Sequence, residues 1–188
     1  MHGPAPRLTG NGFVLTPPTP SDIPALVEAC TEAEAVSSLN VPQPYTRADA
    51  EAYIRAAQAG DGGYFWAIRE VDDAPLMGMV KMSFAALPGA TATPPTGLLE
   101  ADVGGIYLLP AHRSKGIATC AARLVAQWGF DRGFDTLQWE CLASNTASIA
   151  VAERIGFTFY GSGISSSQYA HHQNKVARQA RMARGELR

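Results

Sequence analysis

Two helices are predicted near the start of the chain, where apolar residues recur three or four positions apart. The apolar stripe of the first covers residues 23–30, and we expect Ser21 to cap this helix. The second follows Thr46 and Asp49, which have the three-residue spacing of a capping box, and its apolar positions continue to Ala57. Both helices precede the main run of predicted strands.

A longer helix is predicted from Ile117, with a buried stripe that includes Leu124 and Trp128 and an end at Gly133. Outward-facing polar residues, such as Gln127, lie between the apolar positions of this stripe. A shorter capped helix is predicted within residues 143–157, closed by a glycine. These two helices alternate with strands, which is typical of a mixed α/β protein.

Seven segments are rich in strand formers or alternate apolar and polar residues: 12–16, 64–71, 75–84, 102–109, 136–141, 157–161 and a segment near 175–183. The short turn "DDA" between the second and third predicts an antiparallel hairpin. Residues 85–99 are dense in Pro, Gly, Ala and Thr, which predicts a long loop before the fourth strand. The chain shows no internal repeat.

Composition fits one globular domain over residues 1–188, because 46% of the residues are hydrophobic. The formal net charge of -2 provides no overall field to attract nucleic acid or an anionic membrane. No segment approaches the roughly 18 apolar residues that span a bilayer. The N-terminus does not resemble a secretory signal, so we expect a cytoplasmic protein.

Cysteine and histidine positions do not predict a metal site. Cys30, Cys120 and Cys141 are far apart and form no CxxC pair, so neither zinc nor a disulfide is expected. We expect Cys120 and Cys141 to be small buried residues of the core. His171 and His172 are adjacent but have no spaced partner of another ligand type.

The segment "RSKGIA", which begins at Arg113, lies between a predicted strand and the long helix. The first amides of a helix have no intrahelical partner, and the helix dipole adds positive charge there, so this position favours an anion. Gly116 would let a pyrophosphate approach the backbone, and Arg113 and Lys115 would add charge. The segment matches neither the GxxxxGK[ST] nor the GxGxxG pattern. A simple turn with solvated cations remains the alternative from these residues alone.

Two blocks together resemble the GNAT N-acetyltransferases. The family signature is Arg or Gln, two variable residues, Gly, one variable residue, then Gly or Ala, and Arg113, Gly116 and Ala118 match it. Downstream, "NTASIAVAERIGF" is similar to the next family block through Asn145 and Ser148. The combination resembles the Rim-type branch, related to enzymes that acetylate the N-termini of ribosomal proteins. The resemblance covers roughly residues 8 to 184.

The resemblance implies a mostly antiparallel sheet of about seven strands, split between the fourth and fifth, with about four flanking helices. Acetyl-CoA would lie in the split. Its pantetheine would pair with the backbone of Ile106, Tyr107 and Leu108 and contact Asn145. Its pyrophosphate would lie on amides of the following loop, contributed by Ser114, Lys115, Gly116, Ile117, Ala118 and Thr119.

The resemblance also implies direct attack of a neutral amine on the thioester, with an oxyanion stabilised near Leu108. This mechanism gives no catalytic role to cysteine. Glu100 and Asp102, the acidic residues that enter the fourth strand near the split, are the candidate bases, directly or through water. The chain departs from the family here, because Val103 stands where many Rim-type members have a glutamate. The alternative is that both carboxylates are merely solvated.

The family's usual acid, a tyrosine seven residues after the conserved asparagine, is replaced by Ala152. Ser148, which has the matching place of a Rim-type serine, is therefore the expected proton donor to the CoA thiolate. The alternative is that its hydroxyl only satisfies a backbone N–H at the helix start.

The expected function is acetyl-CoA-dependent N-acetylation of a primary amine, either a peptide or protein N-terminus or a small molecule. A GNAT-like module that binds acyl-CoA without turnover, as a sensor or scaffold, is the alternative from another class. A homodimer is possible, as it is common among similar proteins. The basic C-terminus is interpreted as a solvated face, because aromatic residues do not interleave with its cations.

Overall fold

The structure is a computed structural model that describes residues 3–84, 100–167 and 169–188. The predicted loop over residues 85–99 lies outside the described residues. Eight strands form one sheet: β1 (Leu8–Thr9), β2 (Val14–Thr16), β3 (Gly63–Arg69), β4 (Gly78–Ser83), β5 (Glu100–Leu108), β6 (Thr136–Leu142), β7 (Thr158–Ile164) and β8 (Val176–Ala183). Their order is β1-β2-β3-β4-β5-β6-β8-β7. The seven predicted strands correspond to β2 to β8, and β1 is an additional strand of two residues.

In the described ranges, five α-helices accompany the sheet: α1 (Ile23–Thr31), α2 (Ala33–Ser38), α3 (Arg47–Ala59), α4 (Ile117–Asp131) and α5 (Thr146–Ile155). The predicted capping box of α3 is present, because Thr46 N donates to Asp49 Oδ2 at 2.8 Å and Asp49 N donates to Thr46 Oγ1 at 3.3 Å. The mixed α/β class is confirmed, and the five helices of the described residues compare with about four expected.

Two expectations about the first helices are wrong. Ser21 does not cap α1, because the chain enters through a 3-10 turn at Pro20–Asp22 whose capping box is formed by Thr19 and Asp22. The additional helix, α2, has only six residues, which is too short to show an apolar period. Its N-terminus is capped by Glu32, whose side chain accepts a hydrogen bond from Ala35 N.

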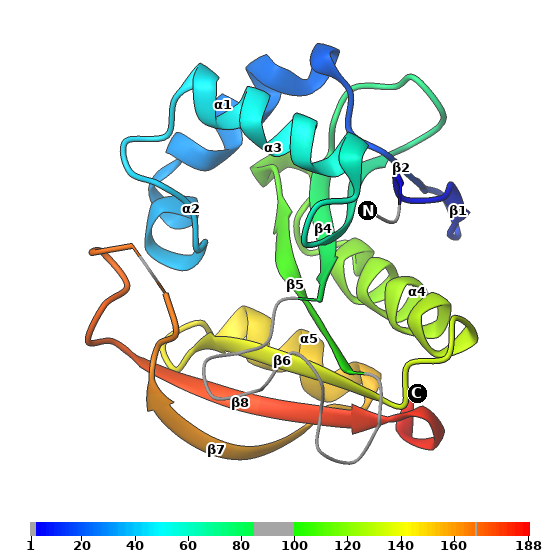
Figure 1. Ribbon diagram of the computed structural model, residues 1–188, viewed down its shortest axis with the longest axis vertical. Helices are drawn as coiled ribbons and strands as arrows, with labels where there is room; N and C mark the ends of the chain where they lie inside the picture. Colours follow the sequence, from blue (N-terminus) through cyan, green and yellow to red (C-terminus); the bar gives the residue numbers. More distant parts are fainter. Residues whose placement is uncertain (1–2, 85–99, 168) are drawn as a thin grey trace.

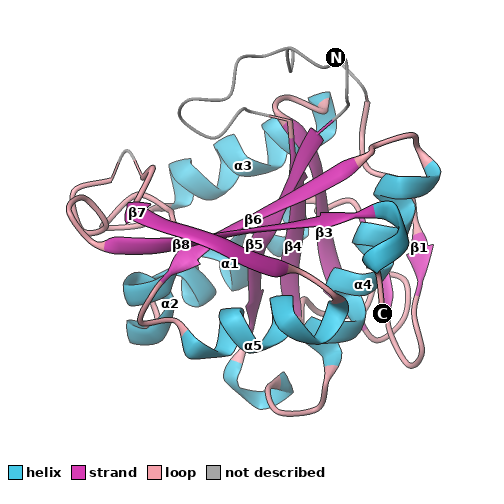
Figure 2. Ribbon diagram, turned by 90° about the horizontal axis from the view of Figure 1, so that it is seen from below, coloured by secondary structure: helices cyan, strands magenta, loops and turns pink. Residues whose placement is uncertain are grey.

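Helices cover both faces of the sheet, and Figure 2 shows α3 and α5 on opposite sides of the strands. Alternation along β4 explains the two layers: Val80 and Met82 belong to the apolar cluster beneath α4 and α5, whereas Met79 belongs to the cluster beneath α1 to α3. No helix among the described residues has the length and apolar character needed to cross a membrane.

The sheet splits between β5 and β6, as expected, and the two strands diverge in Figure 1. They are the one parallel pair in the described sheet, and their pairing runs only from Glu100 opposite Thr136 to Asp102 opposite Gln138. Beyond this point β5 continues with β4, whereas β6 continues with β8. The β4–β5 register shifts near Gly105, whose φ of +57° belongs to the left-handed region. Such a bulge bends a strand, so it accounts for the turn of β5 away from β6.

Candidate active site

The loop before α4 presents backbone groups to open space. Gly116 is the N-cap of α4 with φ +77°, and a Cβ built on it would meet no atom within 4 Å. No side chain caps the helix, so its first amides remain available for an anion. Ser114 also has a positive φ, of 60°. These features fit the expected pyrophosphate cradle, and the contacts of Ser114 to Thr119 with a ligand remain a prediction.

The side chain of Arg113 binds residues of β5 and residues at the start of α2, whereas the family signature suggested a contact with pyrophosphate. Its Nε donates to the carbonyl of Leu108 at 2.9 Å, and its Nη2 donates to the hydroxyl of Tyr107 at 2.6 Å and to Glu32 at 3.2 Å. The Nη1 group pairs with Glu34. Hydrogen bonds from Tyr107 and then Arg113 hold the pKa of Glu32 at about 2. Arg113 therefore fastens α2 to the end of β5, and a direct contact with pyrophosphate stays a prediction.

A cavity of about 790 Å³ occupies the opening between the diverging strands. β4 and β5 line one side, and β6 with the start of α5 lines the other. Among the residues expected to serve the site, Asp102, Ile106, Asn145 and Ser148 line this cavity. The side chain of Tyr107 points instead toward α2, and Leu108 belongs to the apolar core below α4.

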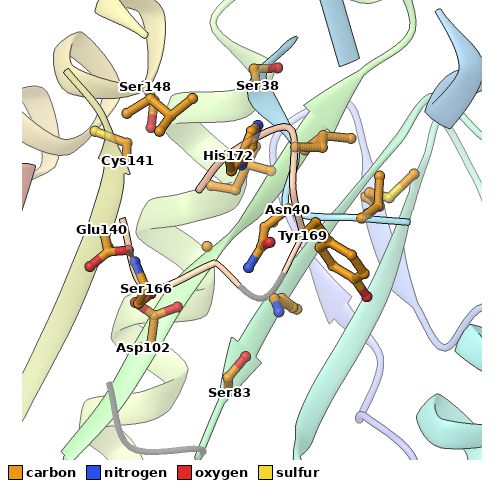
Figure 3. Close-up of a pocket in the computed structure, with 18 of the residues that line it drawn as sticks. Ser38, Asn40, Ser83, Asp102, Glu140, Cys141, Ser148, Ser166, Tyr169 and His172 are labelled. Atoms are coloured by element: carbon orange, nitrogen blue, oxygen red, sulfur yellow. Dashed lines mark hydrogen bonds between the residues drawn. The ribbon is translucent and has the colours of Figure 1, made fainter. Parts of the chain in front are cut away.

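The structure separates the two candidate bases. Glu100 lies at the paired end of β5, where its carboxylate accepts a weak hydrogen bond from Gln138 Nε2 at 3.4 Å. Asp102 is the last residue of β5 to pair with β6, and its side chain lines the cavity (Figure 3). Its Oδ2 atom is buried and has no hydrogen-bond partner among the described residues. Burial raises the pKa of Asp102 to about 6, although the charge of Lys81 opposes this effect. With this pKa, Asp102 is mostly ionised at neutral pH, and its role as a base stays a prediction.

Lys81 is a charged residue of the site that the sequence reasoning missed. It lies on β4 opposite Gly104 and lines the same cavity. A Cβ built on Gly105 would lie only 2.9 Å from Lys81 Cγ, so the lysine stem runs across the bulge of β5. The sequence signal that could have identified it is a lysine within the mostly apolar strand segment "GMVKMSF".

Asn145 and Ser148 adopt defined roles at the start of α5. Asn145 Oδ1 caps the helix by accepting from Ser148 N at 3.0 Å. The Ser148 hydroxyl accepts from the indole Nε1 of Trp139 at 3.1 Å, rather than satisfying a backbone N–H. The indole uses an acceptor lone pair of the oxygen, so the hydroxyl hydrogen of Ser148 can be donated, and a hydrogen bond from Ser148 lowers the pKa of the neighbouring Cys141 thiol against the effect of burial. Contacts of either residue with pantetheine or CoA sulfur remain predictions.

The two cysteines of this region differ. Cys141 is buried beside the cavity, as expected, and burial raises the pKa of its thiol. The expectation that Cys120 is buried is wrong, because it lies on the exposed face of the first turn of α4. Among the described residues, no group of three or more His, Cys, Asp and Glu side chains is arranged to hold a metal ion.

The segments that follow α2 and β7 meet over the cavity, and we call their contacts the clasp. Ser167 Oγ lies 2.6 Å from Asn40 Oδ1, and the His172 ring lies 3.2 Å from the carbonyl of Ser37. Figure 3 shows Asn40, Tyr169 and His172 grouped on this side of the pocket. Ser166 also donates to Glu140 on β6, at 2.7 Å from its hydroxyl. Partners more than 120 residues apart in sequence leave no local signal, so the clasp was not predicted.

Comparison with known proteins agrees with this geometry. The family model described as "Acetyltransferase (GNAT) domain" matches residues 13–158. The chain therefore belongs to the GNAT acetyltransferase family. An aminoglycoside N(6')-acetyltransferase type 1 from Acinetobacter haemolyticus is 36% identical over 67 residues, and the match spans 36% of this chain and only 43% of that protein.

Solved structures share the fold over nearly the whole chain. A probable GNAT acetyltransferase from Chromobacterium violaceum has a TM-score of 0.77 and 19% identity, covering 98% of this chain and 90% of that chain. The ribosomal L7/L12 α-N-protein acetyltransferase RimL, solved in complex with coenzyme A, has a TM-score of 0.74 and 17% identity, covering 95% of this chain and 98% of that chain.

Replacement of Gly116 by Glu should abolish binding of CoA, because the new carboxylate would occupy the open space before the helix amides. Gly133→Glu is a matched control: Gly133 also has a positive φ, +97°, with no atom within 4 Å of a built Cβ, but it lies at the other end of α4. Both variants therefore carry similar backbone strain. Calorimetry should detect CoA binding by Gly133→Glu and none by Gly116→Glu. Equal affinities would show that the anion binds elsewhere.

Proposed function

We propose that this protein transfers an acetyl group from acetyl-CoA to a primary amine in a ternary complex. The observation that carries the proposal is the Oδ2 of Asp102, which is buried in the cavity where the sheet splits and has no hydrogen-bond partner among the described residues. An unpaired buried carboxylate costs stability, and such groups concentrate at sites that move protons. A module that only binds acyl-CoA would gain nothing from this cost, so turnover is favoured over the sensor or scaffold alternative.

Acetyl-CoA would bind along the opened edge of β5. The bulge at Gly105 leaves the backbone of Ile106 to Leu108 outside the β5–β6 pairing, where pantetheine amides can add like a further strand. The pyrophosphate would lie on the amides of residues 114–119, and the amide nitrogen of Asn145 would contact pantetheine. The family and the coenzyme A complex of RimL support this placement.

The chemistry assigned to the site needs one base and one acid. Asp102, directly or through a water molecule, would accept a proton from the incoming ammonium, and the neutral amine would attack the thioester carbonyl. A backbone N–H near Leu108 would stabilise the oxyanion. As the carbon–sulfur bond breaks, the Ser148 hydroxyl would donate a proton to the departing thiolate.

The first candidate acceptor is a peptide or protein N-terminus. An α-amine has a pKa near 8 and a lysine near 10.4, so at neutral pH the reactive neutral form is about 10²-fold more abundant for an α-amine. Asp102, with a pKa of about 6, is better matched to the weaker base. The Rim-type resemblance points the same way, and the aminoglycoside acetyltransferase match keeps a small-molecule amine as the second candidate. A homodimer and a cytoplasmic location remain predictions.

A CoA-release assay over free peptide N-termini, polyamines and aminoglycosides tests the proposal. We expect acceptor-dependent release of CoA with at least one class, and N-acetylated product in equal amount. Mass spectrometry identifies which amine carries the acetyl group. Binding of CoA without release for every acceptor would instead support the sensor or scaffold alternative.

Asp102→Asn should nearly abolish transfer while making the protein more stable at neutral pH. The folded-state pKa of Asp102 is raised, so the folded protein binds this proton more tightly than the unfolded chain and loses stability as pH rises from about 4 to about 6. Asn removes that loss, and we expect a gain of about 1–3 kcal/mol at pH 7 and little difference near pH 4. Urea unfolding of both proteins across this range provides the measurement. Parallel stability curves would contradict the raised pKa.

Ser148→Ala should lower turnover by about 10²-fold, the lower end of general acid catalysis, because a thiolate is a tolerable leaving group. CoA affinity should stay close to that of the parent. Ser144→Ala is the control, since Ser144 is exposed and lies outside the cavity lining. Turnover is measured from pH 6 to 9. Unchanged turnover of Ser148→Ala throughout that range would exclude this serine as the donor.

A further inference from the structure

An amine of the protein itself lies in the proposed active site. A Cβ built on Gly105 would lie 2.9 Å from Lys81 Cγ, 3.2 Å from its Cδ and 3.1 Å from its Cε. These similar distances mean that the lysine stem lies flat across the bulge of β5, and its ammonium is one bond farther on. The lysine is half-buried and lines the cavity. The bulge is also where the edge of β5 that would hold acetyl-CoA begins.

The ammonium of Lys81 is not engaged by the surrounding charges. The described residues provide it with no hydrogen bond and no ion pair, although its charge lowers the pKa of the nearby Asp102. The other carboxylates of the cavity are occupied: Asp49 closes the capping box of α3, and Glu140 accepts from Ser166 and Gln179. Among the described residues, none therefore occupies the ammonium of Lys81.

A base lies beside this amine. A Cβ built on Gly104 would lie 3.1 Å from Asp102 Oδ1, so the carboxylate leans over Gly104 as Lys81 leans over Gly105. The two side chains thus cover neighbouring residues of one bulge, on the face that lines the cavity. The nucleophile and the proton acceptor therefore lie over neighbouring residues of the strand along which acetyl-CoA would bind.

We propose that Lys81 is a self-acetylation site, at which the protein's own bound acetyl-CoA modifies the lysine when no external amine is present. The lysine ammonium first passes a proton to Asp102. The neutral nitrogen then attacks the thioester carbonyl, an amide carbon–nitrogen bond forms, and the carbon–sulfur bond breaks. CoA leaves and is reprotonated as the thiol, so no oxidant or further reactant is needed. This inference rests on the proposed function, because it uses the same bound cosubstrate.

The reaction is slow but favoured by proximity. Only the neutral form of an amine attacks a thioester, so the lysine must first lose its proton to Asp102. Holding the amine beside the bound cosubstrate offsets this requirement, because effective molarities of well-oriented groups are large. An external α-amine, with more of its neutral form available, competes effectively, so the modification accumulates when acceptor is scarce.

Acetylation would change the site that performs it. It removes the positive charge of Lys81. That charge now lowers the pKa of Asp102, whereas burial and the negative charge of Glu140 raise it. The acetylated protein should therefore require a higher pH to keep Asp102 ionised, and transfer to external amines should fall at pH 6 to 7. Self-acetylation would thus lower the rate of transfer to external amines when acetyl-CoA is abundant relative to the acceptor.

The three lysines of the chain, Lys81, Lys115 and Lys175, make the test internally controlled. Lys115 and Lys175 are exposed, whereas Lys81 is half-buried. Non-enzymatic acetylation would depend on the solvent exposure of each lysine and would therefore modify Lys81 last. The full-length protein is incubated with acetyl-CoA alone, and peptide mapping by mass spectrometry follows each lysine over time. We expect Lys81 to be modified at least about tenfold faster than either exposed lysine, because only Lys81 gains from proximity.

Three further arms identify the mechanism. Dilution of the protein should leave the rate constant at Lys81 unchanged, since donor and lysine are held by one molecule. Gly116→Glu should stop the reaction at Lys81 and leave slow labelling of Lys115 and Lys175 intact. Acetyl phosphate, a donor that does not need the CoA site, should label the exposed lysines in preference to Lys81. Lys81→Arg keeps the charge and should remove the fast-labelled site.

Labelling of Lys81 no faster than that of Lys175, or equal labelling in Gly116→Glu, would overturn the inference. The outcome is separable from that of the proposed function. Transfer to an external amine without modification of Lys81 would remove only the self-acetylation. Fast labelling of Lys81 without any external transfer would support the inference and leave the acceptor class unsupported.

Discussion

The site depends on the short length of the parallel pairing between β5 and β6. Three residue pairs hold the strands together, and the last joins Asp102 to Gln138. Beyond it, the bulge at Gly105 carries β5 toward β4, and β6 follows β8. The opened edge of β5 presents backbone groups that no strand satisfies. Because unpaired buried backbone groups are costly, such an edge is suited to a ligand that pairs like a strand.

The same geometry explains the chemistry of Asp102. A carboxylate at the last paired position is enclosed by both strands, yet it faces the cavity, and the part of the chain that the structure describes provides no hydrogen-bond donor for Oδ2. Burial then favours the neutral acid and raises the pKa to about 6. Lys81 limits the shift from the other side of the bulge, and it brings an amine to the place where acyl transfer is proposed. One bulge thus positions both the base and a potential internal acceptor.

Arg113 connects this site to the rest of the molecule. The arginine joins the carbonyl of Leu108 to Glu32 and Glu34, and α2 is thereby fixed to the end of β5. The chain that follows α2 then reaches the β7–β8 loop through the clasp. The walls of the cavity, which come from distant parts of the sequence, are in this way held against one another.

Local signals predicted the elements, but long-range contacts decided the site. The apolar period of α4 and the Thr46–Asp49 box depend on neighbours in sequence, so both were predictable. The six-residue α2 is too short to show an apolar period. Thr19 is the cap in place of Ser21, because a 3-10 turn over Pro20–Asp22 precedes α1. Glu100 and Asp102 look equivalent in sequence. Only the end of the β5–β6 pairing distinguishes them.

Backbone amide chemical shifts on addition of CoA test the central claim, that the divergence of β5 from β6 creates the CoA site. We expect the largest changes at Ile106, Tyr107, Leu108 and residues 114–119, with small changes at Glu100 and Ala101, where the two strands remain paired. Changes of equal size along all of β5, or changes confined to residues outside the split and the α4 loop, would contradict it.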